Sequence, residues 1–352
     1  MLDAAEIAQK LAFLLIGHTG LSALARPLVG NVGVILMLHR VTARLGRPDG
    51  ANRHLSITPQ FLDALVREMK RLGYRFVSMD EAVLRLRTPG NGEPFAAVTA
   101  DDAYRDNLLE ALPVLEHHEV PIAIYVAPGL TSGVVDLWWE GLDELVGSTA
   151  RLTVSMAGAE ASFDCSTPAG RSAAFSRLSS YLTDEVAEAD QRKVLDGWTR
   201  AAGVDVHAAS AKLLMNWDEV RQIARHPLVT IGAHTVNHYN LKRLDPEAVL
   251  REMHRSRSLI EAELGKAPSH FAYPYGHSEA VGRRETLLAG EAGYVSAVTT
   301  RHGVLRPEHA GHLHALPRLS VNGRHQDLAA MRAMLSGATT VMANRGRRLV
   351  TV

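Results

Sequence analysis

The sequence has few cysteines, no excess of either charge and no long hydrophobic run. Its 352 residues include a single cysteine, Cys165, which excludes an intramolecular disulfide framework and a cysteine-rich zinc module. Neither charge is in surplus, because 38 Lys and Arg balance 38 Asp and Glu, and the pI of about 7.3 argues against a nucleic-acid-binding protein. No apolar run approaches the roughly 18–20 residues that span a bilayer. A hydrophobic content of 46% is enough to bury a full core.

Residues 1–30 form a segment of their own. Residues 11–17 are a short apolar stretch, and the Ala-Leu-Ala at 23–25 resembles the site at which a secretion signal is cleaved. The flank before the stretch carries two acidic residues beside Lys10, so the positively charged start of such a signal is missing. Because the apolar residues recur at helical spacing, we expect an amphipathic helical segment that packs on the protein or contacts a membrane surface. This pattern predicts a cytoplasmic protein, free or in peripheral contact with a membrane, rather than a secreted one.

Beyond residue 30 the hydrophobic pattern alternates between strands and helices. Residues 32–38 are a continuous apolar run of the kind that is buried on both faces in a parallel sheet. A cap and a proline at Thr58-Pro59, followed by apolar residues at a spacing of 3.6, predict a helix that ends near Gly73. Similar patterns predict strands at 76–79, 95–99, 122–126, 228–231, 271–273, 295–298 and 316–321, and helices that include 108–117 and 246–264. Such alternation is typical of an α/β fold whose parallel sheet is closed or nearly closed.

One long interruption breaks this alternation. Between about residues 131 and 225 the sequence contains Trp138-Trp139, a middle part rich in Ser, Ala and Gly, and a helical stretch at 184–200. We interpret this part as a large helical insertion that forms a cap beside the functional site. Trp138, Trp139 and Trp198 are candidates for an aromatic wall on which the rings of a ligand stack, with packing in the core as the alternative for at least two of them.

Two adjacent carboxylates follow the strand predicted at 95–99. The segment reads Thr99-Ala100-Asp101-Asp102-Ala103-Tyr104, and the C-terminal ends of parallel strands carry the loops in which functional residues gather. Because successive residues point in different directions, one acid can bind a cation while the other stays free as a base. The alternative is that Asp102 only caps a helix that begins near Tyr104.

Two histidines follow the strand predicted at 228–231, in the segment His234-Thr235-Val236-Asn237-His238. In a helical turn this spacing places both imidazoles on one face, and two neutral imidazoles with one carboxylate are a ligand set for a catalytic zinc or similar divalent ion. An isolated pair among 17 histidines would be incidental, but acids at a second strand end favour a site. The strand at 271–273 ends at Pro274-Tyr275-Gly276, which alone would be ordinary turn chemistry.

In this order, the three segments resemble the motifs of the polysaccharide deacetylase family, also called the NodB-homology or carbohydrate esterase family 4 domain. The matching segments are 99–104, 234–238 and 274–275, together with 37–41 for the opening strand. The resemblance covers residues 32–321 apart from the insertion. It implies a distorted (β/α)7 barrel, which we place at residues 31–325, followed by a C-terminal helix and tail at 326–352.

The resemblance also implies the chemistry of the site. One divalent metal ion is implied, zinc in the first place and cobalt or another divalent ion as the alternative. The residues that match the family's metal ligands are Asp102, His234 and His238. Asp101 matches the general base, which takes a proton from the attacking water. The backbone amide of Tyr275 would help to hold the developing oxyanion, which requires a fixed turn such as Pro274 provides. Thr235 is expected to orient the loop between the two histidines.

The sequence departs from the family pattern in three places. Ala103 stands where the family has a glycine, so a positive φ there would strain the loop. Ala272 stands where many members have an arginine that orients the catalytic aspartate, and the basic residues that can replace it are Arg40, Arg105 and Arg318. The family's general-acid histidine belongs to a Leu-x-His motif near the last strand, and here Leu313-His314 is out of register. His314 is our candidate for the acid, with His312 as the alternative. His39 also faces the predicted site, unless it is a buried structural histidine.

These observations predict a metal-dependent hydrolase that removes an N-acetyl group from a sugar in a polysaccharide, oligosaccharide or glycolipid, in cell-surface glycan synthesis. Its partner would be an N-acetylated glycan and not a nucleic acid. One alternative is a carbohydrate-binding relative without turnover, which the departures from the motifs would suit. Another is a hydrolase of a non-sugar amide. The complete set of Asp101, Asp102, His234 and His238 favours the sugar hydrolase, because a pure binder has no need of a base beside a metal site.

Overall fold

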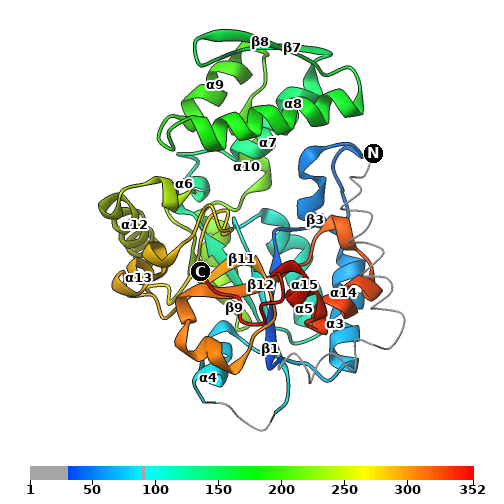
Figure 1. Cartoon of the computed structure of the whole chain (residues 1–352), viewed down its shortest axis with the longest axis vertical. Coiled ribbons are helices and arrows are strands. Elements are labelled where there is room, and N and C mark those ends of the chain that lie inside the picture. Colours follow the sequence, from blue (N-terminus) through cyan, green and yellow to red (C-terminus); the bar gives the residue numbers. More distant parts are fainter. Residues whose placement is uncertain (1–30, 89–91) are drawn as a thin grey trace.

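The computed structural model describes residues 31–88 and 92–352, and the segment predicted at 1–30 lies outside them. Seven parallel strands form a closed ring (Figure 1), in which each pairs with the next and the last pairs with the first. In order around the ring they are β1 (Gly33–Leu38), β12 (Leu316–Ser320), β11 (Ser296–His302), β10 (His270–Ala272), β9 (Val229–Ala233), β6 (Ile122–Val126) and β5 (Phe95–Ala100). This ring confirms the predicted distorted (β/α)7 barrel.

The ring is unevenly closed. β1 and β5 pair along all six residues of each strand, whereas β10 has only three residues and is registered with β9 through the single pair Phe271 and Ala233. The ring is therefore held by the fewest rungs between β9 and β10. A further short strand, β4 (Arg75–Phe76), pairs with the start of β5, on the edge that β6 occupies further along. Outside the barrel, β2 (Arg40–Val41) pairs with β3 (Ser56–Ile57).

Helices connect the strands and cover the outside of the barrel. They are α3 (Pro59–Arg71), α4 (Met79–Arg87), α5 (Leu112–His117), α11 (Trp217–Ala224), α12 (Pro246–Leu264), α13 (Arg283–Glu291), α14 (Leu328–Leu335) and α15 (Ala338–Ala343). In α3 the Thr58 hydroxyl accepts a hydrogen bond from the Phe61 N–H, and the buried face carries Leu62, Leu65 and Met69, as the sequence pattern predicts. No helix in the described part of the chain combines the length and apolar character needed to cross a membrane.

Short helical turns lie between these elements. They are η1 (Ala51–Leu55), η2 (Asn107–Ala111), η3 (Tyr181–Glu185), η4 (Leu241–Arg243), η5 (Pro307–Gly311), η6 (Leu313–Ala315) and η7 (Gly323–His325), of which η2 and η3 have the wider π-helical turn. Every residue of β1, β5 and β6 is buried, which explains their continuous apolar sequences. The largest fully buried side chain is nevertheless polar, because Arg318 on β12 lies inside the barrel.

The chain from α7 to α10, residues 138–213, forms a cap that stands above the barrel in Figure 1. After the short helix α6 (Pro128–Thr131), the cap contains α7 (Trp138–Ser148), β7 (Arg151–Met156), β8 (Ala159–Asp164), α8 (Pro168–Ser180), α9 (Gln191–Ala201) and α10 (Val206–Leu213). It has an apolar core of its own, which includes Leu142, Leu178 and Leu195. The antiparallel β7–β8 hairpin is an addition to the helical insertion expected from the sequence. Its alternating pattern places only three buried residues on β7.

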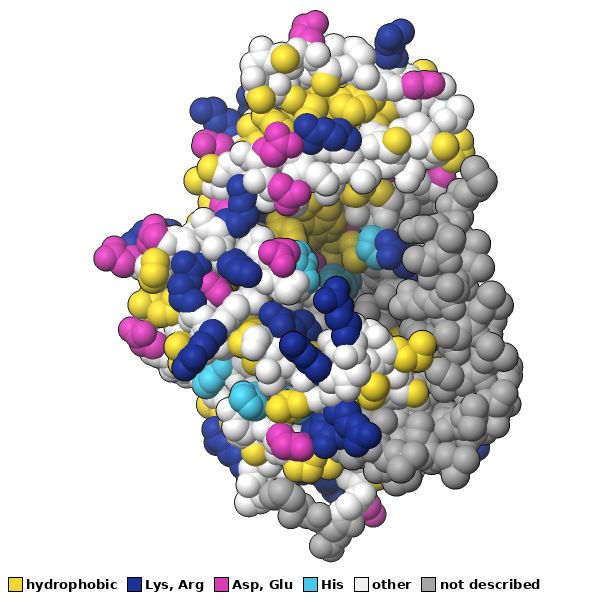
Figure 2. Space-filling model, viewed as in Figure 1, with side chains coloured by type: hydrophobic (Ala, Val, Ile, Leu, Met, Phe, Trp, Pro, Cys, Tyr) yellow, Lys and Arg dark blue, Asp and Glu magenta, His cyan; other side chains and the backbone are white. Residues whose placement is uncertain are grey.

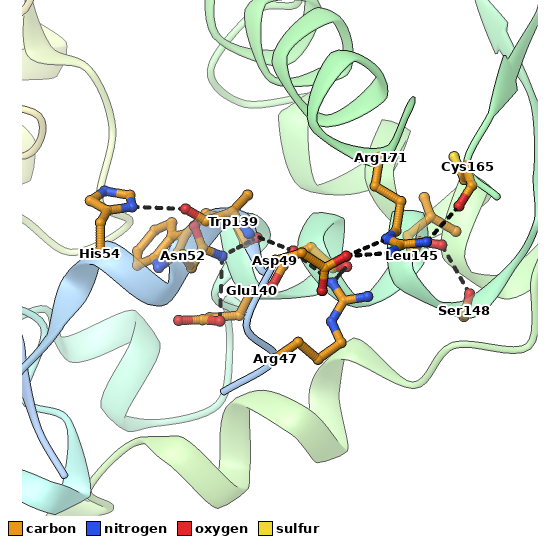
Figure 3. Close-up of polar contacts among 12 residues, drawn as sticks. Arg47, Asp49, Asn52, His54, Trp139, Glu140, Leu145, Ser148, Cys165 and Arg171 are labelled. Atoms are coloured by element: carbon orange, nitrogen blue, oxygen red, sulfur yellow. Dashed lines mark hydrogen bonds and ion pairs between the residues drawn. The ribbon is translucent and has the colours of Figure 1, made fainter. Parts of the chain in front are cut away.

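A loop of the barrel fastens the cap at its base. Arg47 and Asp49 lie between β2 and β3 and reach across to the cap (Figure 3). The Arg47 guanidinium donates to the Asp143 carboxylate on α7 at 2.8 Å, and the Asp49 carboxylate accepts from Nε of Arg171 on α8 at 2.8 Å. Two charged contacts to two different helices hold the cap over the C-terminal ends of the barrel strands.

Candidate active site

A cleft of about 770 Å³ lies between the cap and the C-terminal ends of the strands. Figure 2 shows the molecule hollowed below the cap, with hydrophobic and histidine side chains around the hollow. Five of the six residues predicted for the site line this cleft: Asp101, Asp102, His234, His238 and Tyr275. The barrel therefore brings together the ends of β5, β9 and β10, as the positions of the motifs after their strands predict.

Asp102 and the two histidines converge on one point. Oδ1 of Asp102 lies 3.5 Å from Nε2 of His234 and 3.4 Å from Nε2 of His238. All three side chains are buried. Within the described residues, Oδ1 of Asp102 has no hydrogen-bond partner. Since a buried carboxylate oxygen without a partner is costly, the arrangement leaves this atom ready for a ligand.

The three side chains fit a divalent ion. Ligand atoms that share a tetrahedral ion at about 2.0–2.1 Å lie about 3.3–3.4 Å from one another, which is close to the two distances from Asp102. The ligand atoms of the three residues all lie within 4.8 Å of one another, and no other trio of His, Cys, Asp or Glu in the described ranges does so. Imidazole nitrogens with a carboxylate oxygen suit zinc and related transition metals.

Hydrogen bonding fixes which nitrogen of His234 is free. Its Nδ1 lies 2.7 Å from the carbonyl oxygen of Ala272. Because a carbonyl only accepts, Nδ1 carries the hydrogen, and the lone pair of the neutral ring is on Nε2, the atom that faces Asp102. Burial lowers the pKa of both His234 and His238, which favours the neutral imidazoles that bind metal ions.

A hydroxyl holds the loop between the two histidines from within. Oγ1 of Thr235 accepts a hydrogen bond from the backbone N–H of His238 at 2.9 Å. This contact closes the turn that returns the second imidazole toward Asp102. Thr235 is fully buried, so no water competes for the contact.

Glu252 on α12 holds the same loop from outside, and it is not among the residues predicted from the sequence. Its Oε2 accepts hydrogen bonds from the backbone N–H groups of Val236 and Asn237 at 2.8 and 3.0 Å. A signal for this role exists, because Glu252 lies on the buried face of α12 beside Val249 and Met253, where a carboxylate needs partners.

Asp101 lies next to this trio but has a different partner. Its Oδ1 and Oδ2 accept hydrogen bonds from the two terminal nitrogens of Arg318 at 2.8 and 2.7 Å. Burial by itself would raise the pKa of Asp101, but the charge and hydrogen bonds of Arg318 outweigh it and lower the pKa to about 2. For Asp102, burial and then the charges of Asp101 and Glu140 raise the pKa. Asp101 is thus ionised at neutral pH, and each of its oxygens keeps a second lone pair.

Arg318 also resolves the departure at Ala272. Of the three basic residues that the sequence offered as replacements, Arg40 and Arg105 pair with other carboxylates, at 2.9 and 2.7 Å. Arg318 is the one that pairs with Asp101. Asp101 therefore has an arginine partner, which comes from β12 and not from β10.

Backbone strain is concentrated in the three site segments. Non-glycine residues with positive φ include Asp102 (68°), Ala103 (54°), Thr235 (59°), His238 (55°) and Tyr275 (61°). Each such conformation costs on the order of 1 kcal/mol or more. Ala103 has the backbone conformation that suits a glycine, and its side chain is fully buried. The strain that the sequence predicts at Ala103 is therefore present, and it is shared by all three loops.

Tyr275 is at the centre of a three-residue turn. The Gly276 N–H donates to the Pro274 carbonyl at 2.7 Å, which gives a γ-turn of the strained, positive-φ kind. The Thr300 hydroxyl donates to the Tyr275 carbonyl at 2.6 Å, and the Tyr275 hydroxyl accepts from the Trp138 indole N–H at 3.0 Å. The backbone N–H of Tyr275 has no hydrogen-bond acceptor among the residues that the structure covers.

The structure does not bring His314 to the cleft. His314 precedes β12, and its Nε2 lies 2.8 Å from the carbonyl oxygen of Tyr294, which precedes β11. Both residues therefore lie at the N-terminal ends of their strands, opposite the cleft. His312 is exposed in the same segment. This placement does not support His314 as the general acid. Within β12, the Leu-x-His spacing falls on Leu316-Pro317-Arg318, with arginine in place of histidine.

The remaining sequence candidates divide between the cleft and the cap. His39, after β1, lines the cleft, and burial lowers its pKa to about 4. Trp138 and Trp139 line it too, and the Trp139 ring lies 4.8 Å from that of His238. Trp198 does not line the cleft. It stacks on Tyr181 in the core of the cap with 5.9 Å between ring centroids.

Comparison with known proteins finds a family match over part of the chain. Residues 196–295 match the family model described as polysaccharide deacetylase, and this span contains both histidines and Pro274-Tyr275. Over these residues the chain is similar to the polysaccharide deacetylase family. None of the curated proteins compared with the chain matches it.

Solved structures of deacetylases share the fold of this chain. The deacetylase PplD of Streptococcus pyogenes, in complex with acetate, is 18% identical with a TM-score of 0.56, over 86% of this chain and 97% of that one. IcaB from Ammonifex degensii is 18% identical with a TM-score of 0.54, over 87% and 98%. BC0361, a polysaccharide deacetylase from Bacillus cereus, is 15% identical with a TM-score of 0.54, over 86% and 68%. At these identities the likeness is one of fold.

Proposed function

We propose that this chain is a metal-dependent hydrolase that removes the N-acetyl group from a sugar of a glycan. The observation that carries the proposal is the contrast between two adjacent carboxylates. Asp102 directs an unpartnered oxygen toward the Nε2 atoms of two histidines, while Asp101 is kept ionised by Arg318. Asp102 is thus suited to bind a metal ion and Asp101 to accept a proton. Metal-assisted amide hydrolysis requires both roles.

Asp102, His234 and His238 would hold the ion. When bound, the ion would act as a Lewis acid toward the amide carbonyl and would lower the pKa of a water molecule. Asp101 would accept the proton of that water through one of its unused lone pairs, because Arg318 occupies only one direction at each oxygen. Arg318 also fixes the plane of the carboxylate, so Asp101 needs no reorientation as the proton arrives.

Tyr275 would stabilise the oxyanion, and the leaving nitrogen needs a proton. The strained turn leaves the Tyr275 N–H without an internal acceptor, and a fixed backbone donor of this kind is suited to a developing oxyanion. His314 lies at the far end of the barrel, whereas His39 lines the cleft. Burial lowers the pKa of His39 to about 4, so it is neutral at pH 7 and suits a hydrogen bond to the substrate. The proton that Asp101 takes from the water is then the one available to the leaving nitrogen.

The cleft has the character of a carbohydrate site. Its volume of about 770 Å³ is in the range of ligand pockets, about 300–1,000 Å³. Polar side chains such as Asn52, His54 and Ser179 share its walls with Trp138 and Trp139, and aromatic faces beside hydrogen-bonding groups suit pyranose rings. The N-acetylated glycan is therefore the favoured substrate over a non-sugar amide.

Metal content and acetate release test the proposal together. Protein purified without added metal should contain about one divalent ion per chain by mass spectrometry, and it should release acetate from short N-acetylglucosamine oligomers. Chelation should abolish release, and zinc or cobalt should restore it. Asp101→Asn should keep the ion and lose turnover by about 10²–10⁴-fold, whereas His238→Ala should lose both. An ion without acetate release would favour another amide or a binding role, and absence of an ion after metal addition would overturn the site.

A further inference from the structure

A second cavity opens at the surface of the cap, behind one wall of the cleft. It has a volume of about 440 Å³ and is lined by α9, the start of α7 and residues 203–207. Trp138 lines both this cavity and the cleft, and its indole N–H donates to the hydroxyl of Tyr275. Trp138 thus separates the cavity from the cleft and contacts Tyr275, a residue of the proposed reaction centre.

The acidic side chains that line this cap cavity all have partners. Asp136 lies 3.2 Å from Nδ1 of His207, and Asp196 pairs with Arg200 at 2.6 Å. Asp205 accepts a hydrogen bond from the Ala208 N–H at 2.9 Å and so caps α10. Asp196 thus has a charged partner, whereas the partner of Asp205 is a neutral N–H group and, among the described residues, its charge stays unpaired.

Arg192 is the charged residue of the cavity that lacks a counterion. No carboxylate of the described residues lies within 4.0 Å of its guanidinium, and its Nε is buried without a hydrogen-bond partner. Its other contacts are neutral, with the Gln191 side chain, with the Asn237 carbonyl at 3.4 Å and with the Tyr275 hydroxyl. The nearest acid that affects its pKa, Glu188, is itself paired with Arg243 at 2.9 Å. A buried guanidinium without an anion is unfavourable.

The walls of the cavity restrict the anion that would fit. Leu195, Val204 and Val206 supply apolar surface beside the guanidinium, which suits a short apolar group attached to a charged head. A guanidinium binds a carboxylate through two parallel hydrogen bonds. Three aspartates also line the cavity, and they would repel a polyanion such as phosphate more strongly than a monoanion. A small monocarboxylate satisfies all three conditions.

We propose that the cap cavity binds a short-chain monocarboxylate through Arg192, and that the ligand is the acetate which deacetylation releases. The choice of acetate rests on the proposed function, whereas the carboxylate class rests on Arg192 and the walls of the cavity. Bound acetate would lie one residue away from the histidine loop, because Arg192 contacts the carbonyl of Asn237 between the two histidines. The cavity would therefore receive the product beside the centre that forms it.

Binding of acetate to metal-free protein tests the site separately from the proposed metal centre. The full chain is treated with a chelator, and ¹³C-labelled acetate is titrated in at constant ionic strength while its line width is followed. We expect saturable binding of acetate. Arg192→Gln should weaken it by about tenfold or more, because the two parallel hydrogen bonds of the guanidinium are lost. Arg200→Gln is the matched control, since Arg200 lines the same cavity but is exposed and paired with Asp196. It should change the affinity by less than about twofold.

Each other outcome would overturn the site. Absence of saturable binding, equal binding by Arg192→Gln, or tighter binding of phosphate than of acetate would do so. If circular dichroism shows that Arg192→Gln does not fold, Arg192→Lys replaces it. This variant keeps the charge but not the two parallel hydrogen bonds, so it should bind acetate several-fold more weakly than the unaltered chain. Acetate binding by a chain that releases no acetate from N-acetylated glycans would refute the proposed function and leave the carboxylate site standing.

Discussion

Arg318 and Asp101 face each other inside the barrel, joined by two parallel hydrogen bonds of 2.8 and 2.7 Å. Arg318 also donates to the Thr299 carbonyl and to the Thr99 hydroxyl. These contacts connect β12 to β5 across β1, which lies between them in the ring. One buried ion pair therefore serves both the closure of the barrel and the position of the proposed base.

Replacing Arg318 should affect both roles. Arg318→Met leaves the Asp101 carboxylate buried without a partner, so we expect the free energy of unfolding to fall by about 3–5 kcal/mol. Arg318→Lys keeps the charge but not the two parallel bonds, and it should retain the fold while lowering turnover. Urea unfolding and acetate release measure the two effects. Since Asp101→Asn removes the base that Arg318 positions, adding Arg318→Lys to Asp101→Asn should cost little further turnover. Additive losses would show that the pair does not act as a unit.

The ligand trio should respond differently from the base. Replacing His234 with alanine removes a nitrogen that faces Asp102, so metal occupancy and turnover should fall together. Asp101→Asn should lower turnover alone, because Arg318 and not the ion is its partner. Metal content per chain, measured by mass spectrometry on both variants, separates the two cases. Full occupancy in His234→Ala would refute its place among the ligands.

Glu252 should matter for metal affinity although it lies outside the cleft. Glu252→Ala removes the acceptor of two backbone N–H groups in the histidine loop. We expect the free energy of unfolding to fall by about 1–3 kcal/mol and metal affinity to fall by about 10–100-fold. Glu261→Ala, an exposed position on the same helix, is the control and should change neither. A loss of stability with unchanged metal affinity would show that the loop keeps its shape without Glu252.

Stability in acid should depend on Glu68, far from the cleft. Glu68 on α3 accepts hydrogen bonds from Arg71 and from Arg332 on α14, which lower its pKa to about 2. Because the pKa is lower in the folded state, this stabilisation is complete above about pH 4.5 and is lost as the pH falls toward 2. Glu68→Gln should cost about 1–2 kcal/mol at pH 7, and the difference should vanish near pH 2. Urea unfolding across this range tests it, with the exposed Glu247→Gln as control.

The barrel could be predicted because its strands have a clear hydrophobic pattern in the sequence. The runs at 32–38, 95–99 and 122–126 correspond to β1, β5 and β6, since strands buried on both faces are apolar throughout. Patterns with little burial were less informative. The hairpin of the cap has three buried residues on β7, and the strand predicted at 76–79 is reduced to β4, because Met79 begins α4.

The site could be predicted where its residues lie shortly after a strand. Asp101, Asp102, His234, His238 and Tyr275 follow the ends of β5, β9 and β10, and the parallel strands bring these ends together. The partner of Asp101 could not be chosen from the sequence, because three arginines were available and only the closure of the ring decides which one points inward. His314 was misplaced for a related reason. It lies before β12 and Arg318 lies within it, and a difference of four residues along a strand separates one end of the barrel from its interior.

His234 also helps to join β9 to β10. Only one residue pair registers these strands, and the imidazole of His234 spans the same junction through its bond to the Ala272 carbonyl. The ring of strands is thus completed by a side chain where the backbone ladder is shortest. A chain altered at His234 would lose part of its architecture along with its chemistry, and selection for a closed barrel would preserve this histidine even in a descendant that no longer turned over any substrate.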